Sequence, residues 1–362
     1  MRDAGINVDW PRLISQNGLQ QNHYISVAGA NQDIRYHLGA GYTQQQGVYM
    51  GDDEQKVNFK GSLDAKINKF LTGGFSINLA KIANRYASDR GVSNAYRTNA
   101  FWKPYFEEGD IYFDVEDPSS LPYQVGDLIP QPGCRYYIGT EGYQFSSGFN
   151  PLLYWENEEK QKEAWRMMAN AYLSFKPIKS LEFKTTFSPS YTQSTTGYYQ
   201  KEVSENSYRP NSAYVQTSSG LSWTWDNMIT YTQNFDDIHD INVMGLASAT
   251  YGMSEHNKYQ TTDVMEGTLW YNLATGTYDA NNSYNSYSES SMLSYALRAN
   301  YTLLNKYLFT ATARWDGSSR FAEGYKWGSF PSAAFAWRLS EEDWFDGTEE
   351  WLSNLKLRAA YG

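Results

Sequence analysis

The residues of this sequence that could do chemistry are few, and their spacing suits none of the common sites. Its four histidines have no HExxH spacing and no cysteine nearby: His23, His37, His239 and His256. Zinc sites need several such ligands at close and regular spacing. We therefore interpret these histidines as side chains on the surface or in a wet lumen. The one cysteine, Cys134, excludes an internal disulfide and any cysteine-based metal cluster.

Carboxylates are grouped but equally unspecific. Four acidic clusters could ligate calcium: 52–54, 107–108, 236–237 and 341–343. None has the ligand spacing around a central glycine that an EF-hand loop requires, so solvated turn charge is the simpler interpretation. The segment Gly39-Ala40-Gly41 lacks the strand–turn–helix setting of a phosphate loop, and no glycosidase carboxylate pair stands out. We expect no catalytic residue, no metal and no cofactor, and hence no enzyme.

Composition narrows the class of protein further. The 362 residues carry 40 acidic and 30 basic side chains, a net charge of −10, which argues against a nucleic-acid binder. Aromatic residues make up 17% of the chain although its mean hydropathy is −0.64. No apolar run approaches the 18 residues of a membrane-spanning helix. The apolar groups must therefore alternate with polar ones, or face something other than water.

Period-two alternation runs along the whole chain and predicts β-strands. Leu293, Tyr295 and Leu297 share one face, for example, and Ser294 and Arg298 share the other. We predict about twelve strands, most of them longer than the five or six residues usual in soluble proteins: 22–30, 33–45, 55–68, 70–81, 162–176, 181–192, 221–233, 240–252, 290–303, 306–316, 328–340 and 353–362.

The connections between these strands alternate between short and long until 341–352, a medium, acidic connection where a short one should fall. The long ones are 46–54, 82–161, 193–220, 253–289 and 317–327. Short turns at one end and long loops at the other are typical of outer-membrane barrels. We predict an all-β fold, an antiparallel transmembrane β-barrel, with mid-strand charges such as Arg35 and Lys60 facing a wet lumen and strand-end Tyr and Trp forming interfacial girdles. A soluble β-sandwich or propeller is the alternative.

One stretch of the sequence resembles a known family. It covers residues 290–340 and contains Arg314-Trp-Asp-Gly-Ser-Ser-Arg-Phe321 and Phe330-Pro331-Ser332, followed by Trp337-Arg-Leu-Ser-Glu-Glu342. This pattern is similar to the barrel signature of SusC/RagA-type TonB-linked outer-membrane transporters. The signature residues are Arg314, Asp316, Gly317, Ser318, Ser319, Arg320, Phe321 and Pro331. We expect their role to be structural.

The resemblance implies a 22-stranded barrel around a plug, of which this chain supplies about twelve strands. The plug and about ten strands are then absent, and the chain is expected to be a fragment. Residues 1–21 are expected to be the remnant of the connection from plug to barrel, and residues 22–362 the N-terminal part of the barrel. The implied location is the outer membrane of a Gram-negative, Bacteroidota-like cell, in contact with its lipid.

The implied function is import of oligomeric nutrients, glycan more than peptide. A SusD-like surface lipoprotein would cover the mouth, and TonB would act through the absent N-terminal region. Aromatic residues in the long loops suit contacts with substrate or lid: Trp102, Tyr105, Trp270, Tyr271, Tyr284 and Tyr287. Equally, these loops could pack on one another. A non-transporting outer-membrane adhesin, and a soluble aromatic-rich β protein that binds or hydrolyses carbohydrate, remain alternative functions.

Overall fold

The computed structural model describes residues 7–107, 124–129, 150–201, 210–345 and 351–362. Cys134 and residues 1–6 of the predicted connection lie outside this range, as do most of residues 108–149 in the longest predicted loop. No helix in the described part of the chain has the length and apolar character needed to cross a membrane.

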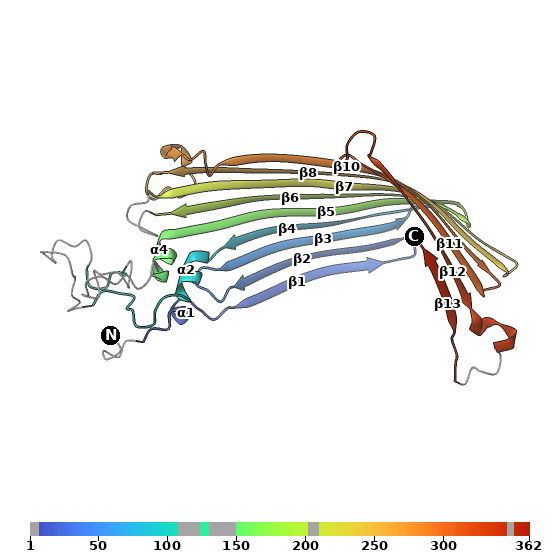
Figure 1. Ribbon diagram of the computed structural model, residues 1–362, viewed down its shortest axis with the longest axis horizontal. Helices are drawn as coiled ribbons and strands as arrows, with labels where there is room; N and C mark the ends of the chain where they lie inside the picture. Colours follow the sequence, from blue (N-terminus) through green and yellow to red (C-terminus); the bar gives the residue numbers. More distant parts are fainter. Residues whose placement is uncertain (1–6, 108–123, 130–149, 202–209, 346–350) are drawn as a thin grey trace.

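The described strands form one antiparallel sheet (Figure 1). Twelve of them follow one another across the sheet in chain order, and β9 pairs only with β8. The all-β antiparallel prediction is confirmed, and each of the twelve predicted strands matches one strand on this path. The strands are β1 Gln20–Ala30, β2 Ile34–Gln46, β3 Asp53–Lys66, β4 Leu71–Arg85, β5 Glu158–Ile178, β6 Leu181–Gln200, β7 Ser212–Phe235, β8 His239–Thr262, β9 Thr277–Tyr278, β10 Tyr284–Leu303, β11 Tyr307–Ser318, β12 Trp327–Arg338 and β13 Lys356–Tyr361.

The two ends of the sheet differ in their connections, as predicted. The turn end carries five short connections, 31–33, 67–70, 179–180, 236–238 and 304–306. The loop end carries the long ones and the described α-helices, α1 Trp10–Leu13, α2 Asp89–Ala95 and α4 Pro151–Asn157 (Figure 1). The sheet thus has short turns at one end and long connections that contain helices at the other.

Asparagine side chains build several of the short turns. Asn31 Oδ1 accepts backbone hydrogen bonds from Asp33 at 2.9 Å and Ile34 at 2.7 Å. Asn68 and Asn234 accept equivalent bonds in their own turns. An Asn side chain that binds the backbone two or three residues ahead favours a tight reversal. These turns hold adjacent long strands in register with few connecting residues.

The strands extend further at the loop end than the sequence predicted. β5 to β8 and β10 are 20 to 24 residues long. The prediction ended the sixth strand at residue 192, whereas β6 continues to Gln200, and it began the seventh at 221, whereas β7 begins at Ser212. The added residues are polar on both faces, so their hydropathy does not alternate. Their backbones nevertheless pair without a break.

Successive side chains of each strand point to opposite faces of the sheet. Pairing aligns them across the strands, and we call the two faces the outer row and the inner row. The outer row is apolar and half exposed; Phe175 and Leu297, for example, are 45% and 53% exposed. The inner row is polar: the Tyr172 hydroxyl donates to Asp64 Oδ1 at 2.7 Å. A soluble protein would bury so large an apolar face. The outer row is therefore the lipid-facing side, and the inner row faces the lumen.

Clustered apolar burial lies at the loop end, in two places. The cap cluster joins the three helices and their connections: Trp10, Ile14, Ala95, Trp102, Leu128, Leu152 and Leu153. The hook cluster comprises Tyr199, Ala213, Val264 and Trp270. Ser88 and Asn150 cap the N-termini of α2 and α4. The cap cluster places the described part of residues 1–21 at the loop end, and the assignment of residues 1–21 and 22–362 to connection and barrel remains a prediction.

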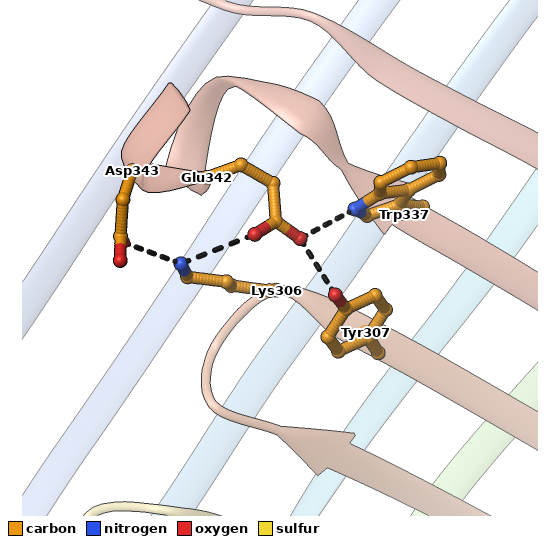
Figure 2. Close-up of polar contacts among 5 residues, drawn as sticks. All are labelled: Lys306, Tyr307, Trp337, Glu342 and Asp343. Carbon is orange, nitrogen blue, oxygen red and sulfur yellow. Dashed lines mark hydrogen bonds and ion pairs between the residues drawn. The ribbon is translucent and has the colours of Figure 1, made fainter. Parts of the chain in front are cut away.

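The connection between β12 and β13 broke the predicted alternation, and its described residues 339–345 lie at the turn end and contact the sheet. Its 3-10 turns η5 Leu339–Glu341 and η6 Asp343–Phe345 flank Glu342. Figure 2 shows Glu342 accepting hydrogen bonds from the Tyr307 hydroxyl at 2.7 Å and Trp337 Nε1 at 2.9 Å. Lys306 Nζ lies 3.3 Å from Glu342 Oε2 and 3.0 Å from Asp343 Oδ1. One carboxylate thus ties the connection to two girdle aromatics.

These contacts predict a pH-dependent role for Glu342. The hydrogen bonds from Tyr307 and Trp337, with the Lys306 charge, hold the pKa of this carboxyl below its usual value. A lowered folded-state pKa adds stability that is present above the unfolded pKa, about 4.3, and is lost as pH falls through the folded value. We expect Glu342→Gln in the full-length receptor to lower the melting temperature at pH 7, with the deficit shrinking below about pH 4.

Thermal unfolding in detergent micelles, followed by circular dichroism at pH 7, 4 and 3, measures this. Glu341→Gln is the matched control, because its side chain is exposed one residue away. A deficit of the same size at every pH, or an equal effect of the control, contradicts the role.

Candidate functional site

A cavity of about 540 Å³ lies at the loop end of the inner row. Its walls come from the start of β5 and β7, the end of β6 and β8, and the residues that lead into α2. Register places Lys160, Tyr198 and Tyr214 in one line across three strands, on the inner face. We call this the inner cavity, lined by Tyr86, Ala87, Ser88, Asp89, Arg90, Glu158, Lys160, Tyr198, Gln200, Pro210, Ser212, Tyr214, Lys258, Gln260, Thr262 and Asn282.

Aromatic rings and a lysine form one wall of the inner cavity. The rings of Tyr198 and Tyr214 are stacked, with centroids 5.0 Å apart and planes inclined by 19°. Lys258 Nζ lies 4.3 Å from the Tyr214 centroid, a cation–π distance. The Tyr198 hydroxyl donates to Gln200 Oε1 at 3.1 Å. This wall therefore offers a ring surface bordered by a cation and an amide.

Charged groups of both signs lie beside this wall, on β5 and in the residues around the start of α2. The Ser88 hydroxyl donates to Glu158 Oε2 at 2.6 Å. Glu158 Oε1 is buried and has no hydrogen-bond partner among the described residues. Lys160 Nζ lies 3.9 Å from Asp89 and 5.3 Å from the centroid of the Tyr86 ring. A buried acceptor without a partner is a place where a hydroxyl or N–H of a ligand would bind.

Burial shifts the pKa values of two groups in the aromatic wall. β7 runs for 24 residues from Ser212 to Phe235, and a tilted strand crosses the hydrocarbon in about 9–11 residues. Tyr214 and Lys258 therefore lie beyond the membrane, on the loop-end side. Burial raises the pKa of Tyr214 and lowers that of Lys258, with Asp279 opposing the change at the lysine. The aromatic wall is thus partly shielded from water, which strengthens polar contacts to a ligand.

The side chains that line the inner cavity are suited to binding a ligand. Stacked rings, three amide side chains and charges of both signs suit an oligomer rich in hydroxyl or amide groups. The described residues contain no group of three or more His, Cys, Asp or Glu that could hold a metal ion.

Two of the predicted contact aromatics lie in the longest loop, around the cap cluster. Trp102 is 3% exposed and packs inside that cluster. Tyr105 is 43% exposed, and its backbone bridges to Leu128. Trp102 therefore follows the alternative expectation for these loops, that they pack on one another.

The other four divide between the two faces of the sheet. Tyr284 pairs with Lys258 on the inner row, beside the inner cavity. Tyr287 pairs with Glu255 on the outer row, and its hydroxyl donates to Glu289 at 3.0 Å. Trp270 packs in the hook cluster, with Tyr271 beside it and 75% exposed. The structure brings Tyr284 to the cavity and the other three to the outer face, and contact with substrate or lid stays a prediction for all six.

The signature residues form a structural unit across β10, β11 and β12. Arg314 Nε donates to both carboxylate oxygens of Asp316, at 2.8 and 2.9 Å, and its Nη2 donates to Ser294 at 3.3 Å. Gly317 leaves room for the ring of Trp327, which would collide with a Cβ there. The hydroxyl of Ser319 accepts from the backbone of Ser291 at 2.9 Å.

The remaining signature residues continue this unit. The Ser318 hydroxyl accepts from the backbone of Arg320 at 3.3 Å, and Arg320 Nη2 donates to the Ser290 hydroxyl at 3.2 Å. The backbone of Phe321 donates to the Ser318 carbonyl at 3.4 Å, and Pro331 pairs with Ala313. These contacts stay within the sheet and its adjoining turn.

The sequence interpretation missed the residues at the centre of the inner cavity. Tyr198, Tyr214 and Lys258 all lay in segments that were predicted to be loops. A signal was present, because Tyr198 and Gln200, like Ser212 and Tyr214, keep the period-two spacing of the strands they extend. Polar and aromatic spacing, rather than hydropathy, would have found them.

Comparison with known proteins gives a consistent set of relatives. No family model matches the chain. It is 26% identical over 360 residues to TonB-dependent receptor P26 of Formosa agariphila, covering 98% of this chain and 34% of that receptor. It is also 26% identical over 375 residues to TonB-dependent receptor SusC of Bacteroides thetaiotaomicron, with the same coverage. The chain thus spans about one third of the length of these curated relatives.

Solved structures agree on the fold. The RagAB peptide importer in its closed-closed state superimposes with a TM-score of 0.75 at 19% identity, covering 98% of this chain and 38% of that chain. Its open-open state gives a TM-score of 0.74. The recognised signature, the turn and loop ends, the outer row and these matches agree: the chain is similar in sequence and in fold to a stretch of the outer-membrane β-barrel of SusC/RagA-like TonB-dependent receptors.

Proposed function

We propose that this chain is part of a transporter that imports a polar oligomer across the outer membrane, with the inner cavity as a contact point for that oligomer. The observation that carries the proposal is the wall formed by Tyr198, Tyr214 and Lys258. It faces the lumen at the loop end, where an incoming molecule would first meet the barrel. Binding and passage need no chemistry on the substrate, which fits the non-enzymatic prediction.

Within this function we propose a glycan as the substrate, in preference to a peptide. Ring faces bordered by hydroxyl and amide groups suit sugar rings, which present flat C–H surfaces and outward hydroxyls. The relative named RagAB is a peptide importer, and the charges at Lys160, Asp89 and Lys258 would also suit peptide termini. The stacked tyrosine pair favours the glycan.

The partners in this proposal are a SusD-like surface lipoprotein and TonB. The lipoprotein would cover the loop end, where the cap cluster gives the barrel an ordered rim. TonB would act through a region outside these residues. A receptor that binds at the surface without transport is the second candidate, and uptake measurements separate the two. A soluble β protein is disfavoured by the half-exposed apolar outer row.

Removing the Tyr214 ring should weaken substrate binding. Stacking on an aromatic face contributes about 1 kcal/mol or slightly more, so we expect Tyr214→Ala in the full-length receptor to raise the Kd for an imported oligosaccharide about five- to tenfold. Isothermal titration with the purified receptor measures this, and uptake of the labelled oligosaccharide by cells should fall in parallel. Tyr259→Ala is the control, since Tyr259 is 53% exposed on the outer row, next to Lys258. Equal losses in both variants would refute a specific role for the inner cavity.

Replacing Lys258 separates the glycan from the peptide. A neutral glycan gains little from a formal charge, so Lys258→Gln should change its Kd less than about threefold. A peptide whose carboxylate binds Lys258 should lose about tenfold or more, with an affinity that falls steeply as salt is added. Titrations of both ligand types at about 50 and 300 mM salt decide between them.

A further inference from the structure

A second recess lies at the loop end, on the opposite face of the sheet from the inner cavity. It has a volume of about 450 Å³ and is lined by Gln161, Glu163, Trp165, Gln193, Ser194, Thr195, Gly197, Trp270 and Tyr271. Trp165 and Gln193 pair in the outer row of β5 and β6. We call it the outer recess. It opens away from the lumen and is therefore separate from the proposed path of the substrate.

A fold-back of the chain builds one side of the outer recess. Residues 264–273, between β8 and β9, lie over the outer face, where Val264 and Trp270 bury Tyr199 and Ala213. Asn211 Nδ2 donates to the Val264 carbonyl at 3.0 Å. The Trp270 ring rests directly on Gly197, where any Cβ would collide with it. These contacts fix Tyr271 beside the outer wall of the barrel, with its ring 75% exposed.

The outer recess begins where the apolar outer row ends. On β6 that row runs through Phe183, Phe187 and Tyr191, and polar Gln193 follows. On β5 it runs from Phe175 to Trp165, and Glu163 follows. The apolar part of β6 therefore spans about the 9–11 residues that cross the hydrocarbon. An occupant of the recess would lie level with the lipid headgroups.

The lining chemistry suits a sugar. Trp165 and Tyr271 expose 53% and 75% of their surface, and amide and hydroxyl side chains belong to the same lining. Among the described lining residues Glu163 alone is charged. It forms an ion pair with Lys81 at 3.4 Å, and Lys81 also lies over the Trp165 ring at 5.7 Å. Because Lys81 balances the charge of Glu163, the lining suits a neutral ring with hydroxyls better than a phosphate.

We propose that the outer recess binds a headgroup sugar of a glycolipid in the outer leaflet, with Tyr271 and Trp165 as the stacking surfaces. The level of the recess just beyond the apolar row selects a lipid-borne sugar over a free one. The fold-back then acts as a clasp that holds one glycolipid against the barrel wall.

The test uses the full-length receptor, purified in mild detergent, delipidated and titrated in bicelles with lipopolysaccharide from the same cells. We expect Tyr271→Ala to raise the Kd for lipopolysaccharide about tenfold. Tyr287→Ala, which removes a similarly exposed outer-row tyrosine outside the recess, should leave the Kd within about twofold. Gly197→Leu, which displaces Trp270, should reproduce the loss.

Two further arms distinguish other occupants. Free oligosaccharide released from the same lipopolysaccharide should bind at least tenfold more weakly than the intact glycolipid; equal affinity overturns the lipid source. Native mass spectrometry should show one glycolipid fewer on the Tyr271→Ala receptor than on the wild type. An unchanged count together with an unchanged Kd overturns the proposal, as does loss of a co-purifying protein in place of a lipid. Substrate uptake is measured separately, since it depends on the inner cavity and its failure would leave the glycolipid result intact.

Discussion

A chain that crosses hydrocarbon must give every backbone N–H and C=O a partner, because no water is present to bind them. Pairing between neighbouring strands meets this requirement over the eleven interfaces that join the twelve strands from β1 to β13. The β5–β6 ladder skips Ala169 and Asn170, next to Pro189, which has no N–H to donate. There Asn170 Nδ2 donates to the Ser188 hydroxyl at 2.8 Å. A side chain thus supplies polar pairing where the backbone cannot.

Strand pairing also fixes which side each residue faces. A slip of one residue would move every apolar side chain of a strand into the lumen, so register and the lipid-facing row support each other. Side chains also alternate between the two faces beyond the membrane, where hydropathy no longer imposes this register. Tyr284 and Tyr287 are three residues apart on β10, and their opposite parity places one beside the inner cavity and the other on the outer wall.

The sequence allowed prediction of the sheet where the membrane constrains it. The alternation correctly predicted that β10 ends at Leu303 and that β6 begins at Leu181, because the apolar row must stop at the membrane interface. The loop end was less predictable. Gln200 ends β6 eight residues beyond the predicted limit, since polar residues on both faces carry no hydropathy signal. Trp270 lies on the outer face because its ring packs on Gly197, over 70 residues earlier in the chain. No local sequence pattern predicts such a contact.

The inner cavity and the outer recess are both lined by residues of β6, and this determines which sequence changes each site can accept. On β6, Tyr198 points into the inner cavity while Gly197 lies under Trp270 on the outer wall. Neighbouring residues therefore serve opposite faces, separated by the thickness of a single backbone layer. Side chains on opposite faces share no partner, so changes at one site leave the contacts of the other in place. What links the two sites is the strand register itself: a bulge that inserts one residue between Gly197 and Tyr198 would turn Tyr198 out of the inner cavity and Tyr199 out of the hook cluster, and so would disturb both sites together.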